Sequence, residues 1–486
     1  RPAVAGARPP AAPAGPVLTT LEVRGADRVA NLLAWAPVAG APGYLVDRRP
    51  AGGGYVDSLA VAVAEPAWRD TAISVHATYV YRVRVPGRPG ASTEVTIGPP
   101  PTGFSTVLSP TSRGTGWDRF GSQVALALDA NDDPVVAWFH SDEDGNNRAD
   151  DSFVYLRRWD RAAYRWRDPV RVAPVGDVSG LGARQLAVAC DAATGTLGVL
   201  FRQAVRDPNP GLVLSLSRDG GVTWQAEPVS GARYETGAAL AFGGGRIHAV
   251  VNRAASDTAF LLVSRPLDGG AWRSTLVPRP DGVRQTEVPA ALALDGAGRP
   301  GVLVAWQPEG GSARTFHFWQ PGMGASRRVL DTEGAQSDRN AVELAWRDGW
   351  HALVLASRAS APASRLHASQ SMDGQAWTPA VALPQDGEDD PGLSVPAIAA
   401  GPRGVAAFHG VLESRATPAC GRPKIVRLGA GGWRTCSPDA SRQLALRVRH
   451  VAAAAAGDGR FYLAAPVDAG SGGGYAAGGL VLWRGE

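Results

Sequence analysis

From about residue 120 onward, the chain repeats one pattern of hydrophobic and polar positions seven times. Each copy is an apolar run, a turn rich in Gly and Asp, and a second apolar run, which is typical of a β-hairpin. The copies recur roughly every 52 to 62 residues, the spacing expected of a repeating β-unit. They begin at Val124, Leu186, Ala238, Ala290, Val342, Pro396 and Val451.

A more polar pair of predicted strands follows most hairpins and ends near a tryptophan, at Trp166, Trp224, Trp272, Trp377 and Trp433. Each unit therefore predicts a four-stranded sheet. The last unit ends after GLVLWRGE and lacks a fourth strand, while GFSTVLSP at 103–110 has the pattern of the fourth strands elsewhere. The repeats predict a seven-bladed β-propeller over residues 101–486, closed by N- and C-terminal strands in one blade, because a closed ring of sheets leaves no long open edge.

The first hundred residues have a different pattern. Residues 1–16 are a Pro/Ala-rich linker, and residues 17–100 alternate short strand patterns with Pro/Gly turns, as a β-sandwich requires. This segment resembles the fibronectin type III family: Trp35 matches its core tryptophan, Tyr44 opens the next strand, and Tyr79 matches its corner tyrosine. The resemblance implies a spacer or a docking module. The predicted fold class is all-β, a fibronectin type III-like sandwich followed by the propeller.

Composition narrows the function classes. The chain has 486 residues, 44% of them hydrophobic, with 60 Gly and 38 Pro, which suits a large β protein of more than one domain. The net charge is +4, but the arginines are scattered among acidic residues, so we expect no nucleic-acid partner. Lys424 is the sole lysine, which disfavours lysine-based catalysis. No apolar run is long enough to cross a membrane, so the body is not expected to be membrane-embedded.

Three cysteines are too few for a disulfide framework. Cys420 and Cys436 bracket a predicted hairpin and could form a bond, whereas Cys190 lies in an apolar strand, where a buried thiol is expected. The Pro/Ala-rich start of the chain suits a mature exported protein or a trimmed chain equally. The expected location is secreted, periplasmic or at the cell surface.

Two short turns share a motif with Ser, Asp, Gly and Trp at nearly fixed spacing. SRDGGVTW supplies Ser217, Asp219, Gly221 and Trp224, SMDGQAW repeats it one residue shorter, and SRPLDGGAW at 264–272 is a degraded version. These turns resemble the Asp-box, the bacterial neuraminidase repeat. The resemblance implies a structural role and a ligand site on the opposite face of the propeller. The second copy consists of Ser371, Asp373, Gly374 and Trp377.

Polar residues at the start of the first strands and the end of the second strands should surround the mouth of the central channel on that opposite face. The set is rich in arginine, which suits an anionic or hydroxylated ligand. The alternative is that these groups pair with one another or line a wet channel. The ligand-binding candidates are Arg119, Arg184, His140, Arg202, Arg253, Gln307, Arg358 and His409.

A sialidase-like glycoside hydrolase is the alternative function. That family uses three arginines, a Tyr nucleophile activated by Glu, and an Asp acid/base, and here Tyr234, Glu235 and Asp118 supply the residue types. Three features disfavour it. The F/Y-R-I-P motif of the family is absent, Tyr234 and Glu235 are adjacent and would point to opposite sides of a strand, and sialidases resemble six-bladed rings.

The insert HSDEDGNNRADD at 140–151 offers hard oxygen ligands of the kind Ca²⁺ takes, in Asp142, Asp144, Asn146 and Asp150, although a solvated acidic loop is the favoured interpretation of it. Motifs for zinc hydrolysis, nucleotide binding and redox chemistry are missing. Apart from Ca²⁺, no cofactor is expected. The predicted function is an exported, non-catalytic binding protein whose propeller holds a glycan or a protein partner. A component of a cell-surface or extracellular assembly, docked through its fibronectin-like domain, is the interaction-protein variant of this prediction.

Overall fold

The computed structural model describes residues 18–25, 28–88, 90–108, 120–140, 152–176, 186–203, 211–229, 235–253, 259–286, 290–311, 314–332, 341–356, 365–384, 396–412, 421–436, 451–467 and 479–485. Every regular element in these ranges is a β-strand, so the all-β prediction is confirmed for them. With no helix among the described residues, none is long and apolar enough to cross a membrane. The chain divides into two compact units, Arg1–Pro100 with Trp159–Arg165, and Pro101–Arg158 with Trp166–Glu486.

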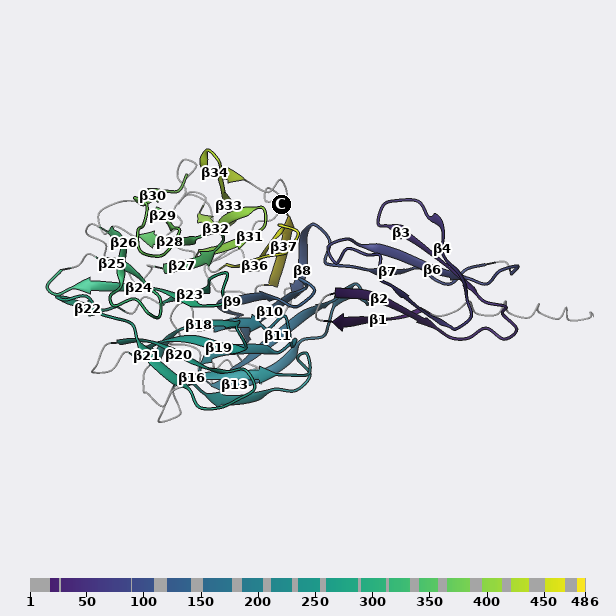
Figure 1. Cartoon of the computed structure of the whole chain (residues 1–486), viewed down its shortest axis with the longest axis horizontal. Helices are drawn as coiled ribbons and strands as arrows, with labels where there is room; N and C mark the ends of the chain where they lie inside the picture. Colours follow the sequence, from purple (N-terminus) through teal and green to yellow (C-terminus); the bar gives the residue numbers. More distant parts are fainter. Residues whose placement is uncertain are drawn as a thin grey trace, which may run out of the picture. The chain divides into compact units, whose positions relative to one another are not determined.

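The first unit contains two antiparallel sheets (Figure 1). Its core draws on both sheets, because Leu33 and Trp35 from one pack with Tyr44, Val46 and Tyr81 from the other. One sheet has the order β1 (Leu18–Gly25), β2 (Arg28–Trp35), β5 (Ala67–Asp70), and the other has the order β4 (Val56–Val63), β3 (Tyr44–Pro50), β6 (Tyr79–Arg84), β7 (Val95–Ile97).

Two buried carboxylates of the first unit are paired with arginines. Asp70 accepts hydrogen bonds from the Tyr81 hydroxyl (2.7 Å) and from Arg48 Nη1 (2.8 Å). Asp47 accepts from Arg82 Nε and Arg84 Nε, both at 2.7 Å. Burial alone would raise the pKa of Asp47, but the bonds from Arg84 and Arg82 outweigh it and hold that pKa below its usual value.

The described strands of the second unit form seven antiparallel sheets, and in most of them each strand pairs with the next strand along the chain. In the first sheet β13 pairs with β11, in the fourth β22 pairs with β24, and in the last the outer strand comes from the start of the unit. The first four sheets comprise β9 (Phe120–Leu128), β10 (Pro134–His140), β11 (Ser152–Asp160), β12 (Arg165–Trp166) and β13 (Val170–Gly176); β14 (Leu186–Cys190), β15 (Leu197–Arg202), β16 (Leu212–Ser217) and β17 (Gln225–Pro228); β18 (Glu235–Gly243), β19 (Arg246–Arg253), β20 (Ala259–Pro266) and β21 (Arg273–Leu276); and β22 (Val283–Gln285), β23 (Ala291–Leu294), β24 (Pro300–Pro308), β25 (Arg314–Trp319) and β26 (Arg327–Thr332).

The last sheet takes its fourth strand from the beginning of the unit, since β8 (Gly103–Leu108) runs antiparallel beside β37 (Gly479–Gly485) (Figure 1). The remaining three sheets comprise β27 (Ala341–Trp346), β28 (Trp350–Ala356), β29 (Arg365–Ser371) and β30 (Val381–Ala382); β31 (Ala397–Gly401), β32 (Gly404–Leu412), β33 (Gly421–Gly429) and β34 (Gly432–Cys436); and β35 (Ala452–Ala455), β36 (Phe461–Val467), β37 (Gly479–Gly485) and β8.

Neighbouring sheets pack face to face in chain order. The first full inner strand of each sheet contacts that of the next, in the order β9, β14, β18, β23, β27, β31, β35, and β35 contacts β9 again. The hydrophobic core is accordingly divided among the interfaces; one cluster, for example, joins Phe139 of β10 to Val199 of β15. A hydrogen bond from the Gly457 amide to Asp132 Oδ2 (2.7 Å) links the last sheet to the first. This all-β arrangement fits a β-propeller.

The turn from Ser217 to Trp224 is held by its own side chains. Asp219 accepts hydrogen bonds from the Val222 and Thr223 amides and from the Thr223 hydroxyl, and Ser217 Oγ accepts from the Gly221 amide at 2.7 Å. Gly221 has φ +92°, a conformation that side chains rarely adopt. The Ser371–Trp377 turn repeats these bonds around Asp373, and its Trp377 ring lies 5.3 Å from Phe318 of the preceding sheet. Both turns are therefore structural.

Asp219 should make the stability of the second unit depend on pH. The Thr223 side chain and amide hold the pKa of Asp219 well below its usual range, so its stabilisation is complete above the unfolded-state pKa of about 3.9 and declines as pH falls below it. In Asp219→Asn, an amide that does not titrate replaces the carboxylate, so this contribution to the pH dependence of stability is lost. We expect the stability gap between wild type and variant, measured by urea unfolding, to stay constant from neutral pH to about pH 5 and to narrow toward pH 2.

Thr223→Val is the matched control, since it keeps the carboxylate and removes only the hydroxyl donor. The difference in stability between wild type and Thr223→Val should therefore change less between neutral and acidic pH than the difference for Asp219→Asn. A gap for Asp219→Asn that is the same at neutral and acidic pH would contradict the assignment.

Candidate functional site

Several of the predicted site residues lie outside the described part of the chain. This applies to Arg119, Arg184 and Arg358, to Tyr234 and Asp118 of the hydrolase alternative, and to the calcium candidates Asp142, Asp144, Asn146 and Asp150. Arg253 ends β19 and Glu235 begins β18, where their backbones pair, but their side chains are not described. Cys420 also lies outside, and of Cys436 only the backbone is described.

Three mouth candidates that are described contact their own surroundings. Gln307 donates from Nε2 to the carbonyl of Gly311 (2.6 Å) across the turn that follows β24. The His140 ring packs edge-on against Tyr155, with the ring centroids 5.6 Å apart. His409 is only 1% exposed within β32. These contacts and this burial are those of side chains with a structural role.

Arg202, at the end of β15, differs from these three. Burial lowers the pKa of its guanidinium, and its Nε is enclosed without a hydrogen-bond acceptor among the described residues. An uncompensated, partly buried charge costs stability. Of the described mouth candidates, Arg202 is the charged group with a buried donor that lacks an acceptor among the described residues, so an anionic or hydroxyl-bearing partner would suit it.

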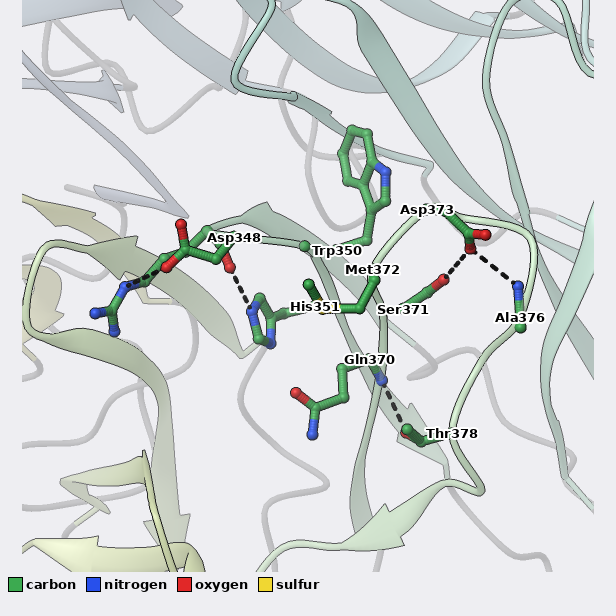
Figure 2. A pocket seen from close by; sticks show the side chains of 11 residues that line it. Asp348, Trp350, His351, Gln370, Ser371, Met372, Asp373, Ala376 and Thr378 are labelled. Atoms are coloured by element: carbon green, nitrogen blue, oxygen red, sulfur yellow. Dashed lines mark hydrogen bonds and ion pairs between the residues drawn. The ribbon is translucent and has the colours of Figure 1, made fainter.

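A cavity of about 510 Å³ opens at the other end of the fifth sheet, beside the Ser371–Trp377 turn (Figure 2). It lies between the β27–β28 turn and the loop that follows β29. Its lining residues are Arg347, Asp348, Gly349, Trp350, His351, Gln370, Ser371, Met372, Asp373, Ala376 and Thr378.

The β27–β28 turn has a shape that few sequences allow. Trp346 pairs with Trp350, and the Arg347 amide bonds to the Gly349 carbonyl at 2.8 Å, so three residues make the reversal. Asp348 has φ +52° and Gly349 has φ +152°. A Cβ on Gly349 would lie 2.9 Å from the Ser371 carbonyl oxygen, so glycine is needed for the turn to approach the loop.

Aromatic packing makes the cavity floor rigid. The Trp350 ring is buried, 4.9 Å from Trp346 and 4.8 Å from Phe318 by ring centroids. Such aromatic clusters fix side-chain positions. The neighbouring polar side chain of His351 therefore lies on a well-packed base.

His351 is a neutral hydrogen-bond acceptor in this cavity. Burial lowers the pKa of its imidazole, and the positive charge of Arg347 adds to the effect, which outweighs the bond to the Arg347 carbonyl. Because its Nε2 lies 3.2 Å from that carbonyl oxygen, Nε2 carries the proton and Nδ1 is left to accept. The second ring nitrogen lies on the side of Gln370 (Figure 2).

Gln370 and Met372 form the opposite wall. The Gln370 amide bonds to Thr378 Oγ1 (3.1 Å) and its carbonyl accepts from the Thr378 amide (2.9 Å), so the backbone is fixed while the exposed carboxamide is free to bind. The Met372 side chain is 76% exposed and offers an apolar, polarisable contact.

The two carboxylates of the lining have different roles. Asp373 is occupied by the Gln375 and Ala376 amides of its own loop, which lower its pKa. Asp348 is 91% exposed and only 3.8 Å from Arg347 Nε, so it can accept bonds from a ligand. The lining thus lacks a second available carboxylate for acid/base hydrolysis. No cluster of metal-binding side chains occurs among the described residues.

Sequence reasoning did not find this cavity, because it placed the site on the face away from the Ser371–Trp377 turn. The sequence signal for this cavity was the turn RDGWH at 347–351, in which polar residues flank a tryptophan. The stretch QSMDG follows it about twenty residues later. Strand pairing brings the two segments together, since His351 lies opposite Gln370 on β29.

Comparisons with known proteins give only distant likenesses. No family model and no curated protein matches the chain. Among solved structures, the fucose-specific lectin from Aleuria aurantia is similar, with 13% identity, a TM-score of 0.40, and coverage of 69% of this chain and 97% of the lectin. An ulvan lyase of a polysaccharide lyase family aligns with 10% identity and a TM-score of 0.47, over 79% and 94% of the two chains. A mutant of the NanB sialidase from Streptococcus pneumoniae aligns with 8% identity and a TM-score of 0.41, over 97% and 92%.

Proposed function

We propose that the second unit is a seven-bladed β-propeller with Asp-box turns and that the first is a fibronectin type III-like module. Seven consecutive sheets with inner strands in cyclic contact support the first part. The side-chain bonds around Asp219 and Asp373 support the Asp-box assignment. For the module, the three- and four-stranded sheets and the bond from the Ser74 amide to the Tyr79 hydroxyl (3.0 Å) are the supporting features.

We propose further that the protein is a non-catalytic glycan-binding protein that acts outside the cytoplasm. The observation that carries the binding function is the cavity at the fifth sheet. There His351 Nδ1, the Gln370 carboxamide and the Asp348 carboxylate can bond to hydroxyl groups while Met372 contacts an apolar C–H face. Sugars present this combination of ring hydroxyls and C–H surface.

The charges of the cavity favour a neutral sugar ring there. Arg347 and Asp348 lie beside each other with opposite charges, the imidazole of His351 is uncharged at neutral pH, and Asp373 is already bonded by its loop. No strong field is left to select an ionic group at the cavity centre.

A glycan microarray with the full chain tests this function. We expect binding to a limited set of saccharides, weakened about three- to tenfold by Gln370→Ala, because a lost ligand hydrogen bond is worth about 0.5 to 1.5 kcal/mol. Gln225→Ala, on an exposed position beside the other Asp-box turn, is the matched control and should bind as wild type does.

A blank array, or equal binding by wild type and Gln370→Ala, would contradict glycan binding at this cavity and favour a protein partner. Running the array with and without calcium also tests the acidic loop at 140–151. A calcium requirement would support that loop as a Ca²⁺ site.

A further inference from the structure

The turns of three successive sheets contact one another next to the cavity. Arg347 donates from Nη2 to the carbonyl of Pro402 (2.7 Å), in the β31–β32 turn of the sixth sheet. Arg403 of that turn packs against Gly459 of the β35–β36 turn, where an added Cβ would lie 2.1 Å from Arg403 Cγ. The edge that carries the cavity therefore continues over the sixth and seventh sheets.

Arginines are concentrated along this edge. We call five of them the basic track: Arg347, Arg403, Arg427, Arg434 and Arg460. Arg403 and Arg434 are exposed. The acidic residues described on the same turns and strands are Asp348 and Asp458, and Asp458 already pairs with Arg460 Nη1 (2.7 Å) and lies 3.7 Å from Arg484 Nη2. Positive charge is thus in excess along the edge.

Among the arginines of the basic track, Arg427 has the most enclosed donor atoms without an acceptor among the described residues. It lies directly opposite Arg434 on the paired strands β33 and β34, and like charges in that position repel. Its guanidinium lies above the Phe461 ring, 5.1 Å from the centroid, which offsets part of the cost. Its Nε and Nη2 are nevertheless enclosed with no hydrogen-bond acceptor among the described residues. Guanidinium groups bind a sulfate or carboxylate through paired N–H donors, and Arg427 would turn its enclosed donors toward the solvent to do so.

We propose that the basic track binds the sulfate or carboxylate groups of an acidic polysaccharide. Since the track begins at Arg347, which also lines the cavity, the same polymer would place a neutral ring in the cavity; this last part rests on the proposed function. Sulfate and carboxylate are both oxyanions that accept hydrogen bonds from guanidinium groups. The two charged dextrans below show which of them is bound.

Binding of the full-length protein to dextran, dextran sulfate and carboxymethyl-dextran of matched length tests the proposal. We expect measurable affinity for at least one charged polymer and far less for dextran. The double variant Arg403→Ala/Arg434→Ala should weaken that affinity about tenfold, as two exposed ion pairs would. The control is Arg273→Ala/Arg284→Ala, which removes two exposed arginines from the third and fourth sheets and should change the affinity less than twofold by the same reasoning.

Arg427→Met adds a measurement that does not depend on surface charge alone. Saturating charged polymer should raise the unfolding temperature of wild type and should raise that of Arg427→Met less, because bound ligand stabilises the native state in proportion to its affinity. Preference for dextran sulfate identifies sulfate as the bound group, and preference for carboxymethyl-dextran identifies carboxylate.

Equal losses in the two double variants would overturn the proposal, since they would show attraction to net charge without a site. An undiminished thermal shift in Arg427→Met would overturn the role of that residue. Failure of the cavity function has a different signature: Gln370→Ala would leave saccharide binding unchanged while the track variants still lose affinity for the charged polymer.

Discussion

Replacement of Trp306 by alanine is expected to lower the free energy of unfolding of the second unit by about 3 to 5 kcal/mol. Trp306 lies in β24, is fully buried, and packs edge-on against Phe260 of the preceding sheet with ring centroids 5.1 Å apart. The ring fills the interface of the third and fourth sheets together with Val250 and Val304. Alanine would leave a cavity that rigid strands on both sides cannot close. Guanidinium unfolding followed by hydrogen exchange in the β19–β25 peptides measures the loss.

Trp306→Phe is the informative control. The indole Nε1 is enclosed with no hydrogen-bond acceptor among the described residues, so phenylalanine removes an unsatisfied donor while it keeps most of the apolar volume. We expect it to cost clearly less than alanine. If both substitutions cost the same, the ring does not fill the interface as described.

Replacement of Asp70 by alanine should destabilise the first unit by about 3 kcal/mol. The carboxylate is 2% exposed and accepts bonds from Arg48, from the Tyr81 hydroxyl and from the Ala72 amide (3.0 Å). Removing it leaves the Tyr81 hydroxyl without its acceptor and the Arg48 charge without its partner. Because water can reach part of Arg48, we expect a destabilisation at the lower end of what the loss of a buried ion-pair partner costs. Hydrogen exchange of β2, β3 and β6 in the full chain reports the effect.

Tyr81→Phe isolates one bond of this network and should cost about 1 kcal/mol, because it removes the hydroxyl and leaves the ion pair of Arg48 and Asp70. Equal exchange rates in wild type and Asp70→Ala would mean that the network does not stabilise the unit.

The repeat pattern was sufficient to predict an all-β chain and the positions of its hairpins. Apolar runs such as the one from Val124 are strands because their two faces pack against two neighbouring sheets, which requires continuous hydrophobicity. The strand at 103–108 could be assigned to the last sheet because a unit with three strands leaves one edge unpaired, and β8 occupies that edge.

The cavity could not be predicted because it depends on contacts between residues far apart in sequence. His351 and Gln370 meet through strand register, and Arg347 reaches Pro402 across a sheet boundary. Arg202 shows the converse. Sequence reasoning selected it as a polar strand end, but the burial that leaves its Nε without an acceptor arises only once β15 is packed.

The pairing of β8 with β37 has a consequence for how the second unit forms. This ladder joins the two ends of the unit, so almost the whole unit is a loop that must be ordered before the ladder can close. Such long-range pairing slows folding and is expected to form late, after the internal hairpins. A circular permutant that moves Gly103–Leu108 behind Gly485 through a short linker would turn this ladder into a local hairpin, and it should reach the same native structure sooner.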